Sequence, residues 1–140
     1  MSLIEGIGKY SIGIDTLISS GFIKSSVTKI SQLNISNNWI PNKCSSLSEF
    51  LANSLLQEQV MTEETQKNYN LLCANGVINQ KNINLPEEVS AWLAVAHGLG
   101  ASGAYDYASN STNDVAAAKL FQQGKFAASF AAEVPMILAG

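Results

Sequence analysis

Apolar residues recur at helical spacing through most of the chain, and only three prolines interrupt the pattern, at positions 41, 86 and 135. This spacing is typical of helices that bury one face. A length of 140 residues supports one hydrophobic core and is short for two. The sequence therefore predicts a single all-α domain over residues 1–140.

Charged residues make up only 14% of the chain, whereas apolar residues make up 46%. We therefore expect a surface built from Ser, Asn, Gln and Thr, or one that a partner covers. All eight basic residues are lysines, against eleven acidic residues, and the net charge is −3. Arginine is the side chain that contacts phosphate or guanine with two hydrogen bonds at once, and the chain has none. Nucleic acid is therefore not an expected partner.

The two cysteines, Cys44 and Cys73, are far apart and have neither a CxxC pair nor a neighbouring histidine. A structural zinc site needs such clustered ligands, so neither a metal nor another cofactor is expected. Two free thiols are the favoured interpretation, and a disulfide is the alternative. The N-terminus lacks a basic stretch followed by an apolar run, and no segment approaches the about 18 consecutive apolar residues of a membrane span. Neither an export signal nor a membrane span is expected.

The first part of the chain carries modest helical signals. We expect a helix at about residues 10–19, ended by Gly21, and a shorter helix near residues 26–30. Residues 32–46 are rich in Asn and Ser, which favours an irregular segment with Trp39 packed beneath it.

The second part carries stronger signals. Ser46 or Ser48 can cap a helix, and a long amphipathic helix follows it and ends near Gly76. Pro86 and two acidic residues then suit the first turn of the next helix. This helix is predicted to run to about Gly98, and its apolar character on almost every side predicts a buried centre. Short alanine-rich helices are expected at 101–109, 114–123 and 126–138.

His97 is the only histidine and lies in this apolar helix. A catalytic histidine needs an orienting carboxylate or a nucleophile within hydrogen-bond reach, so a buried structural histidine is the favoured interpretation. Gly98, Gly100 and Gly103 follow a helix instead of a strand, which argues against a phosphate-binding loop. We interpret these glycines as points of close contact between helices.

Cleavage of a glycoside needs a protonated carboxylic acid that assists the leaving oxygen. The paired acids at 63–64 and 87–88 are interpreted as solvated helix faces, and Asp114 is first of all a candidate helix N-cap. The carboxylates that remain as candidate acids are Glu5, Asp15, Glu49, Glu58, Asp106 and Asp114.

Five segments match one family in the same order. They are GKYSIGIDTLISSGFIK, NNWIPNKCSSLSEFLANSLLQEQVM, NYNLLCANGVI, VSAWLAVAHGLGASGA and DVAAAKLFQQGKFA, over about residues 8–127. The first, which begins with Gly8, Lys9 and Tyr10, resembles the GKYQFG segment of lysozyme-like, lytic-transglycosylase-type peptidoglycan hydrolase modules of bacteriophage tails and virions. The fourth contains His97 and is similar to that family's VAG.LAAAHL.GAGGA segment. The resemblance implies a compact lysozyme-like helical domain.

The chain departs from this family at the residues that carry the chemistry. In the family, a helix that ends in the catalytic acid precedes the GKYQ segment. Here Glu5 stands close before Gly8, with four residues ahead of it, which indicates a domain without that N-terminal helix. Ser11 takes the place of the family's glutamine, so a short hydroxyl replaces a long amide. These departures predict lost or strongly impaired hydrolysis.

The leading hypothesis is a catalytically inactive structural or docking component of a phage tail or baseplate. Its partners would be other virion proteins, and it would reside in the virion after assembly in the host cytoplasm. A first alternative is an active muramidase or lytic transglycosylase with Glu5 as general acid, in which Tyr10, Ser11 and His97 bind the substrate.

A second alternative is a non-catalytic module that binds peptidoglycan. Such a module would need aromatic side chains in an open groove, and Tyr10, Tyr105 and Tyr107 are the candidates.

Overall fold

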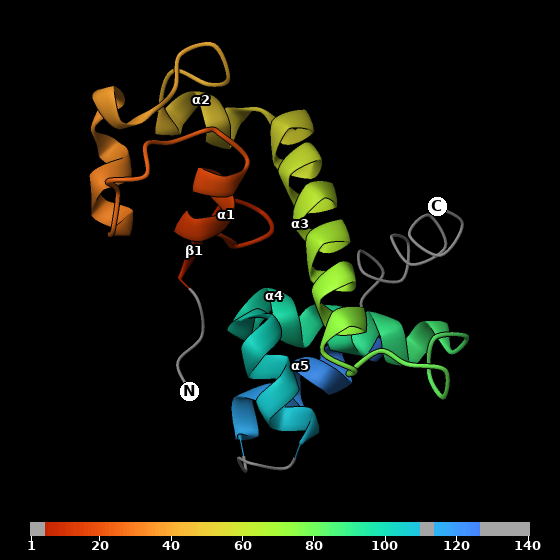
Figure 1. Ribbon diagram of the computed structural model, residues 1–140. Coiled ribbons are helices and arrows are strands. Elements are labelled where there is room, and N and C mark those ends of the chain that lie inside the picture. The colour runs from red at the N-terminus through yellow and green to blue at the C-terminus, as the bar shows by residue number, and fades with distance from the viewer. Residues whose placement is uncertain (1–4, 110–113, 127–140) are drawn as a thin grey trace. The chain divides into compact units, whose positions relative to one another are not determined.

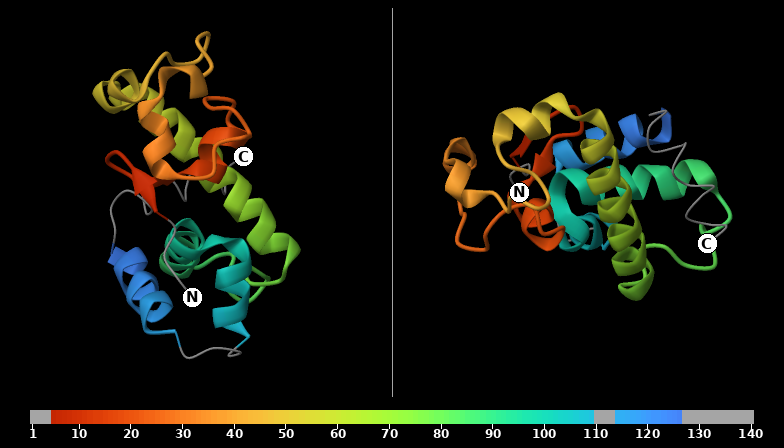
Figure 2. Two further views of the ribbon diagram at one scale, coloured as in Figure 1. Left: turned by 90° about the vertical axis from the view of Figure 1, so that its left-hand side faces the viewer. Right: turned by 90° about the horizontal axis from the view of Figure 1, so that it is seen from above.

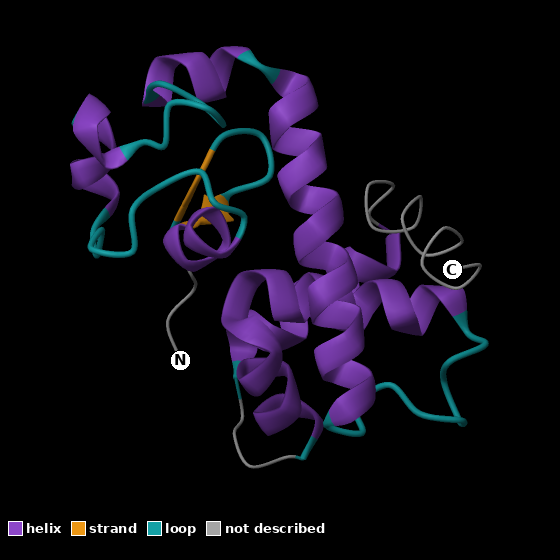
Figure 3. Cartoon of the chain, turned by 45° about the horizontal axis from the view of Figure 1, so that its top comes forward, coloured by secondary structure: helices purple, strands orange, loops and turns teal. Residues whose placement is uncertain are grey.

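The computed structural model describes residues 5–109 and 114–126. This part of the chain is mainly helical, as predicted, but it also contains a two-stranded sheet (Figure 3). The described elements are β1 (Gly6–Ile7), β2 (Ile12–Gly13), α1 (Ile14–Ser19), the short 3₁₀ helices η1 (Ile30–Asn34) and η2 (Ser36–Asn38), α2 (Leu47–Ala52), α3 (Ser54–Ala74), α4 (Pro86–Ala108) and α5 (Val115–Phe126).

The chain divides into two compact units. The N-terminal unit spans residues 5–64, and the described residues from 65 to 126 belong to the helical unit. The boundary falls inside α3, which is one unbroken helix in Figures 1 and 2. Each unit has a hydrophobic core of its own, and the single domain over residues 1–140 stays a prediction.

The N-terminal unit begins with a β-hairpin, which the helical spacing of the apolar residues does not predict. β1 pairs antiparallel with β2, and Gly6 lies opposite Gly13. A Cβ atom on Gly6 would collide with the backbone of Ser11. The turn needs left-handed backbone at Gly8 (φ 73°) and Ser11 (φ 50°), which a helix excludes. The predicted helix over 10–19 was therefore wrong at its start, and α1 begins at Ile14.

The end of α1 follows the prediction. Gly21 has a φ of 79°, and its N–H donates to the carbonyl of Ile18 at 3.0 Å. The N–H of Phe22 donates to the carbonyl of Leu17, also at 3.0 Å. These two bonds form the glycine-dependent C-terminal cap known as the Schellman motif.

The helix predicted near residues 26–30 is absent, and helical backbone begins only with η1 at Ile30. The Gln32 side chain explains the difference, because its Oε1 accepts hydrogen bonds from the backbone N–H groups of Thr28 at 2.7 Å and Lys29 at 3.0 Å. A glutamine at the third helical position that accepts the N–H of the N-cap residue is part of a capping box, and it places the start of the helix at Ile30.

Trp39 anchors the irregular segment that follows, as predicted. Its side chain is 1% exposed, and the indole N–H donates to the Leu33 carbonyl at 2.8 Å. The rings of Phe22 and Trp39 each lie with centroids 5.7 Å from the ring of Phe50. Aromatic packing therefore ties the segment to α2.

Polar caps set the next two helices. The Ser46 hydroxyl accepts the Glu49 N–H at 3.2 Å and begins α2, as predicted. Asn53 has extended backbone and separates α2 from α3, and its Oδ1 accepts the Leu56 N–H at 3.2 Å. After α3, Gly76 adopts a φ of 84°.

The helical unit is built on α4, which begins at Pro86 as predicted and is broken at Gly100, so that its two halves correspond to the helix predicted to end near Gly98 and the helix predicted over 101–109. It continues to Ala108, and Gly100 has non-helical backbone (φ 80°, ψ 164°) within it. The two halves run in different directions (Figure 1). A Cβ atom on Gly100 would meet nothing within 4 Å. Close helix contact is therefore the wrong explanation for this glycine, which serves the bend.

Helix α5 packs on α4 and is capped by Asp114, as predicted. The Asp114 Oδ1 atom accepts the N–H groups of Ala116 at 2.9 Å and Ala117 at 3.1 Å. The Phe121 ring meets the Trp92 ring with centroids 4.9 Å apart. The helix predicted over 126–138 lies, beyond its first residue, outside the described part of the chain.

Candidate functional site

Three of the predicted site residues belong to the hairpin. Glu5 is exposed and directly precedes β1, and Ser11 is exposed in the turn. Tyr10 is half-buried and packs against the core of the N-terminal unit, with the Lys9 ammonium 5.2 Å from its ring centroid. The hairpin therefore holds Glu5, Tyr10 and Ser11 on one short segment.

His97 belongs to the helical unit, where it is half-buried on α4 before the bend at Gly100. The predicted set is thus divided between the two units, with three residues in one and the histidine in the other. That these four residues bind a substrate stays a prediction.

The Gln57 side chain, which is not among the predicted site residues, holds the hairpin turn. Gln57 is 5% exposed, and its Oε1 accepts the backbone N–H of Lys9 at 2.9 Å. Its Nε2 donates to the carbonyls of Phe50 and Leu51, at 3.2 Å each. One buried amide thus links the turn to the end of α2. The sequence signal that could have pointed to this role is a glutamine at a helix position where the spacing calls for an apolar residue.

Carboxylates in the described part of the chain are all exposed or half-exposed. Glu64, one of the half-exposed ones, accepts a hydrogen bond from the Thr16 hydroxyl at 2.8 Å. A glycosidase normally keeps its general acid protonated by burying it in an apolar pocket. None of the described Asp and Glu residues is fully buried.

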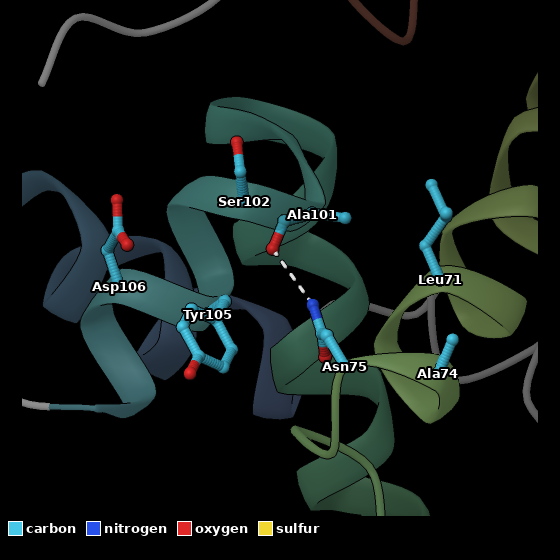
Figure 4. Close-up of a pocket in the computed structure, with 7 residues that line it drawn as sticks. All are labelled: Leu71, Ala74, Asn75, Ala101, Ser102, Tyr105 and Asp106. Atoms are coloured by element: carbon cyan, nitrogen blue, oxygen red, sulfur yellow. Dashed lines mark hydrogen bonds between the residues drawn. The ribbon is translucent and has the colours of Figure 1, made fainter.

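An open groove of about 670 Å³ lies in the helical unit, where the last turns of α3 meet the second half of α4. Tyr105 is 48% exposed there, and Leu71 is 43% exposed. Sequence reasoning named Tyr105 and Asp106 but missed the other lining residues. The groove is lined by Leu71, Ala74, Asn75, Ala101, Ser102, Tyr105 and Asp106 (Figure 4).

The other two tyrosines named for a groove are packed instead. Tyr107 is half-buried, with its ring centroid 5.9 Å from that of Trp92 and 6.4 Å from that of Phe121. Tyr10 is half-buried against the N-terminal core. Of the three, Tyr105 is the one that lines the groove.

Both cysteines are free, which agrees with the favoured interpretation. Cys44 is buried and its burial raises the pKa of the thiol above the ordinary 9.0. Across residues 5–109 and 114–126, no group of three or more His, Cys, Asp and Glu side chains could hold a metal ion. In the same ranges, every helix is too short or too polar to cross a membrane.

Searches among protein-family models, curated proteins and solved structures give no match to this chain.

Proposed function

We propose that this chain is a non-hydrolysing derivative of the peptidoglycan hydrolase modules that it resembles, and that it serves as a structural or docking component of a phage tail or baseplate. The observation that carries the proposal is the exposure of the carboxylates. None of those in the described residues is fully buried, and Glu5 is exposed. Glycosidases typically hold the general acid in an apolar pocket, and Glu5 lacks that burial.

The hydrolase alternative receives little support from the hairpin. Ser11 is exposed in the turn and carries a short hydroxyl. Gln57, which bonds to the turn, is buried and has its amide engaged with backbone groups. The hairpin turn is thus held in place, and Glu5 next to it is exposed.

An assembly role is supported by the surface. The chain has few charges, and several large apolar side chains of both units are exposed, among them Leu55 (77%), Val115 (82%) and Ile35 (54%). Burial of such side chains on association removes apolar area from water. Other tail proteins are the partners that this role implies.

A peptidoglycan-clearing assay tests the absence of hydrolysis. The purified protein and its Glu5→Gln variant should both leave a suspension of cell-wall peptidoglycan turbid, while a known muramidase clears it in parallel. Clearing by the wild-type protein that Glu5→Gln abolishes would establish the enzyme and overturn the proposal.

Analysis of purified virions tests the assembly role. The chain should co-sediment with tails and be detected there by mass spectrometry and by antibody labelling. Leu55→Glu places a charge at the most exposed leucine of the N-terminal unit and should reduce incorporation, whereas Gln59→Glu on the same helix should not. A chain found only in the soluble fraction contradicts the role.

A further inference from the structure

We propose that Asn75 is a site of spontaneous covalent modification, at which the folded chain converts the asparagine to aspartate and isoaspartate and loosens the contact between α3 and the second half of α4. Asparagine followed by glycine occurs once in the sequence, at Asn75 and Gly76. The proposal goes beyond the assembly role and does not depend on it, because the reaction needs only these two residues and water.

The reaction begins at the peptide nitrogen of Gly76. This nitrogen attacks the side-chain amide carbon of Asn75, loses its proton to water or hydroxide, and forms the new C–N bond of a five-membered imide. The bond from that carbon to Nδ2 breaks, and Nδ2 takes up a proton and leaves as ammonia. Water then opens the imide at one of its two carbonyls, which gives aspartate or isoaspartate. Glycine favours the attack because it carries no Cβ atom that would crowd its nitrogen.

Hydrogen bonds around the Asn75 amide determine how easily it reacts. The Gly76 N–H donates to the Cys73 carbonyl at 3.3 Å, and the Asn75 Nδ2 donates to the Ala101 carbonyl at 3.4 Å (Figure 4). Both distances exceed the ordinary range of about 2.7–3.2 Å. The attacking nitrogen and the leaving nitrogen are therefore both weakly held.

A bond to the oxygen of the same amide favours the attack. The Asn75 Oδ1 accepts the Val77 N–H at 3.1 Å, which is an ordinary length. The ring that this bond closes contains the Gly76 nitrogen, so the side chain folds back toward the nitrogen that attacks it. Negative charge develops on Oδ1 as the new C–N bond forms, and an N–H donor already in place stabilises that charge.

The surroundings of Gly76 leave room for the reaction. Gly76 is exposed, and a Cβ atom there would meet nothing within 4 Å, so water can reach the imide. Gly76 also lies beyond the last residue of α3, with a φ of 84°. Its peptide can therefore turn toward the side chain without breaking the body of the helix.

The product would lose the hydrogen bond to α4. The Nδ2 atom that faces the Ala101 carbonyl becomes a carboxylate oxygen, so two acceptors meet where Asn75 now donates. The new negative charge lies at the C-terminal end of α3, where the helix dipole disfavours anions. Isoaspartate also adds a carbon atom to the backbone at this point. The end of α3 is therefore expected to separate from the second half of α4 as the protein ages.

Ageing of the purified folded chain tests the site. The protein is incubated for several weeks at pH 7 and at pH 9, circular dichroism follows its fold, and peptide mapping by mass spectrometry follows each asparagine. Residue 75 should become heavier by about 1 Da, as aspartate and isoaspartate, and faster at the higher pH because hydroxide removes the Gly76 proton. Asn53, which precedes Ser54 and caps α3, is the internal control and should react at least tenfold more slowly.

Variants separate the reaction from its consequence. Asn75→Gln should abolish the mass change, because a six-membered imide closes far more slowly. Asn75→Asp imitates the product and should lower the thermal midpoint by a few degrees. Asn70→Asp is the matched control, since Asn70 is exposed on the same helix and accepts a hydrogen bond from Gln66 at 3.1 Å. Its midpoint should fall by less than half as much.

Two results would overturn the proposal. One is a folded chain in which residue 75 stays unmodified while the urea-unfolded chain gains the mass change, because the native contacts would then protect the amide. The other is an equal midpoint for Asn75→Asp and Asn70→Asp, because the bond to α4 would then make no difference. Neither result bears on hydrolysis of peptidoglycan or on incorporation in virions, so this proposal and the proposed function fail separately.

Discussion

The Ser90 hydroxyl of α4 donates a hydrogen bond of 2.6 Å to the Gly124 carbonyl of α5. Ser90 is completely buried, so this bond satisfies a hydroxyl that water cannot reach. A Cβ atom on Gly124 would lie 2.6 Å from the Ala94 Cβ and 2.8 Å from the Ala91 Cα. The absence of a side chain at residue 124 therefore permits the close approach of the two helices.

Gly124→Ala should destabilise the protein although alanine favours helices. The added methyl group meets backbone and Cβ atoms of α4, and such overpacking costs about 1–3 kcal/mol. Urea unfolding followed by circular dichroism measures the loss. Gln123→Ala, at an exposed position of the same helix, is the control and should stay within about 0.5 kcal/mol of wild type. A Gly124→Ala protein as stable as wild type would contradict the tight contact.

Gln57→Ala should loosen the hairpin. The change removes the acceptor of the Lys9 N–H and one donor each from the Phe50 and Leu51 carbonyls, of which the Phe50 carbonyl keeps the Asn53 N–H. A buried polar group left unpaired costs about 1–3 kcal/mol. Hydrogen exchange should report faster exchange at the Lys9 amide. Gln59→Ala, exposed on the same helix, should leave that amide unchanged. Equal exchange in wild type and Gln57→Ala would show that the amide does not hold the turn.

Gly100→Ala should destabilise the helical unit by about 1–3 kcal/mol, because the φ and ψ angles at this residue are almost exclusive to glycine. The space around the position is empty, so the cost is conformational and not steric. Thermal unfolding compares the variant with Ser102→Ala, an exposed position two residues later. An unchanged midpoint would mean that the bend is not required.

Stability should fall as the pH rises above about 9. Burial raises the pKa of the Cys44 thiol above 9.0, and burial together with the neighbouring Cys73 raises the pKa of the Tyr69 hydroxyl above 10.0. Both groups therefore hold their protons more tightly in the folded state. Their contribution is complete below the unfolded-state pKa and is lost as the pH rises through the folded-state pKa.

Urea midpoints at pH 7, 8, 9 and 10 check this dependence. Cys44→Ala removes the thiol, so the decline between pH 8 and pH 10 should be shallower than in wild type. The same slope in both proteins would mean that Cys44 does not titrate in this way.

Local signals were read correctly from the sequence. Ser46, Pro86 and Asp114 each begin a helix, and Gly21 caps one, because caps act through backbone groups within a few residues. The hairpin was missed for the opposite reason. Its strands have two residues each, and the bond that fixes its turn comes from Gln57, far along the chain.

The groove was only partly foreseeable. Tyr105 could be named as an aromatic candidate, but the sequence near it does not show whether its ring is packed or exposed. The opposite side of the groove is formed by Leu71 in the last turn of α3 and by Asn75, which directly follows this helix. No short-range sequence pattern connects these two residues to Tyr105. The sequence alone does not distinguish a glycine that bends a helix, such as Gly100, from one that allows close packing of another helix, such as Gly124.

The passage from one unit to the other inside α3 limits how the chain can be dissected. A cut between Glu64 and Thr65 would sever a helix and not a loop, leaving unpaired carbonyls on one piece and unpaired N–H groups on the other. Neither fragment would have a capped helix end at the cut. We therefore expect proteases to find no exposed linker at this boundary.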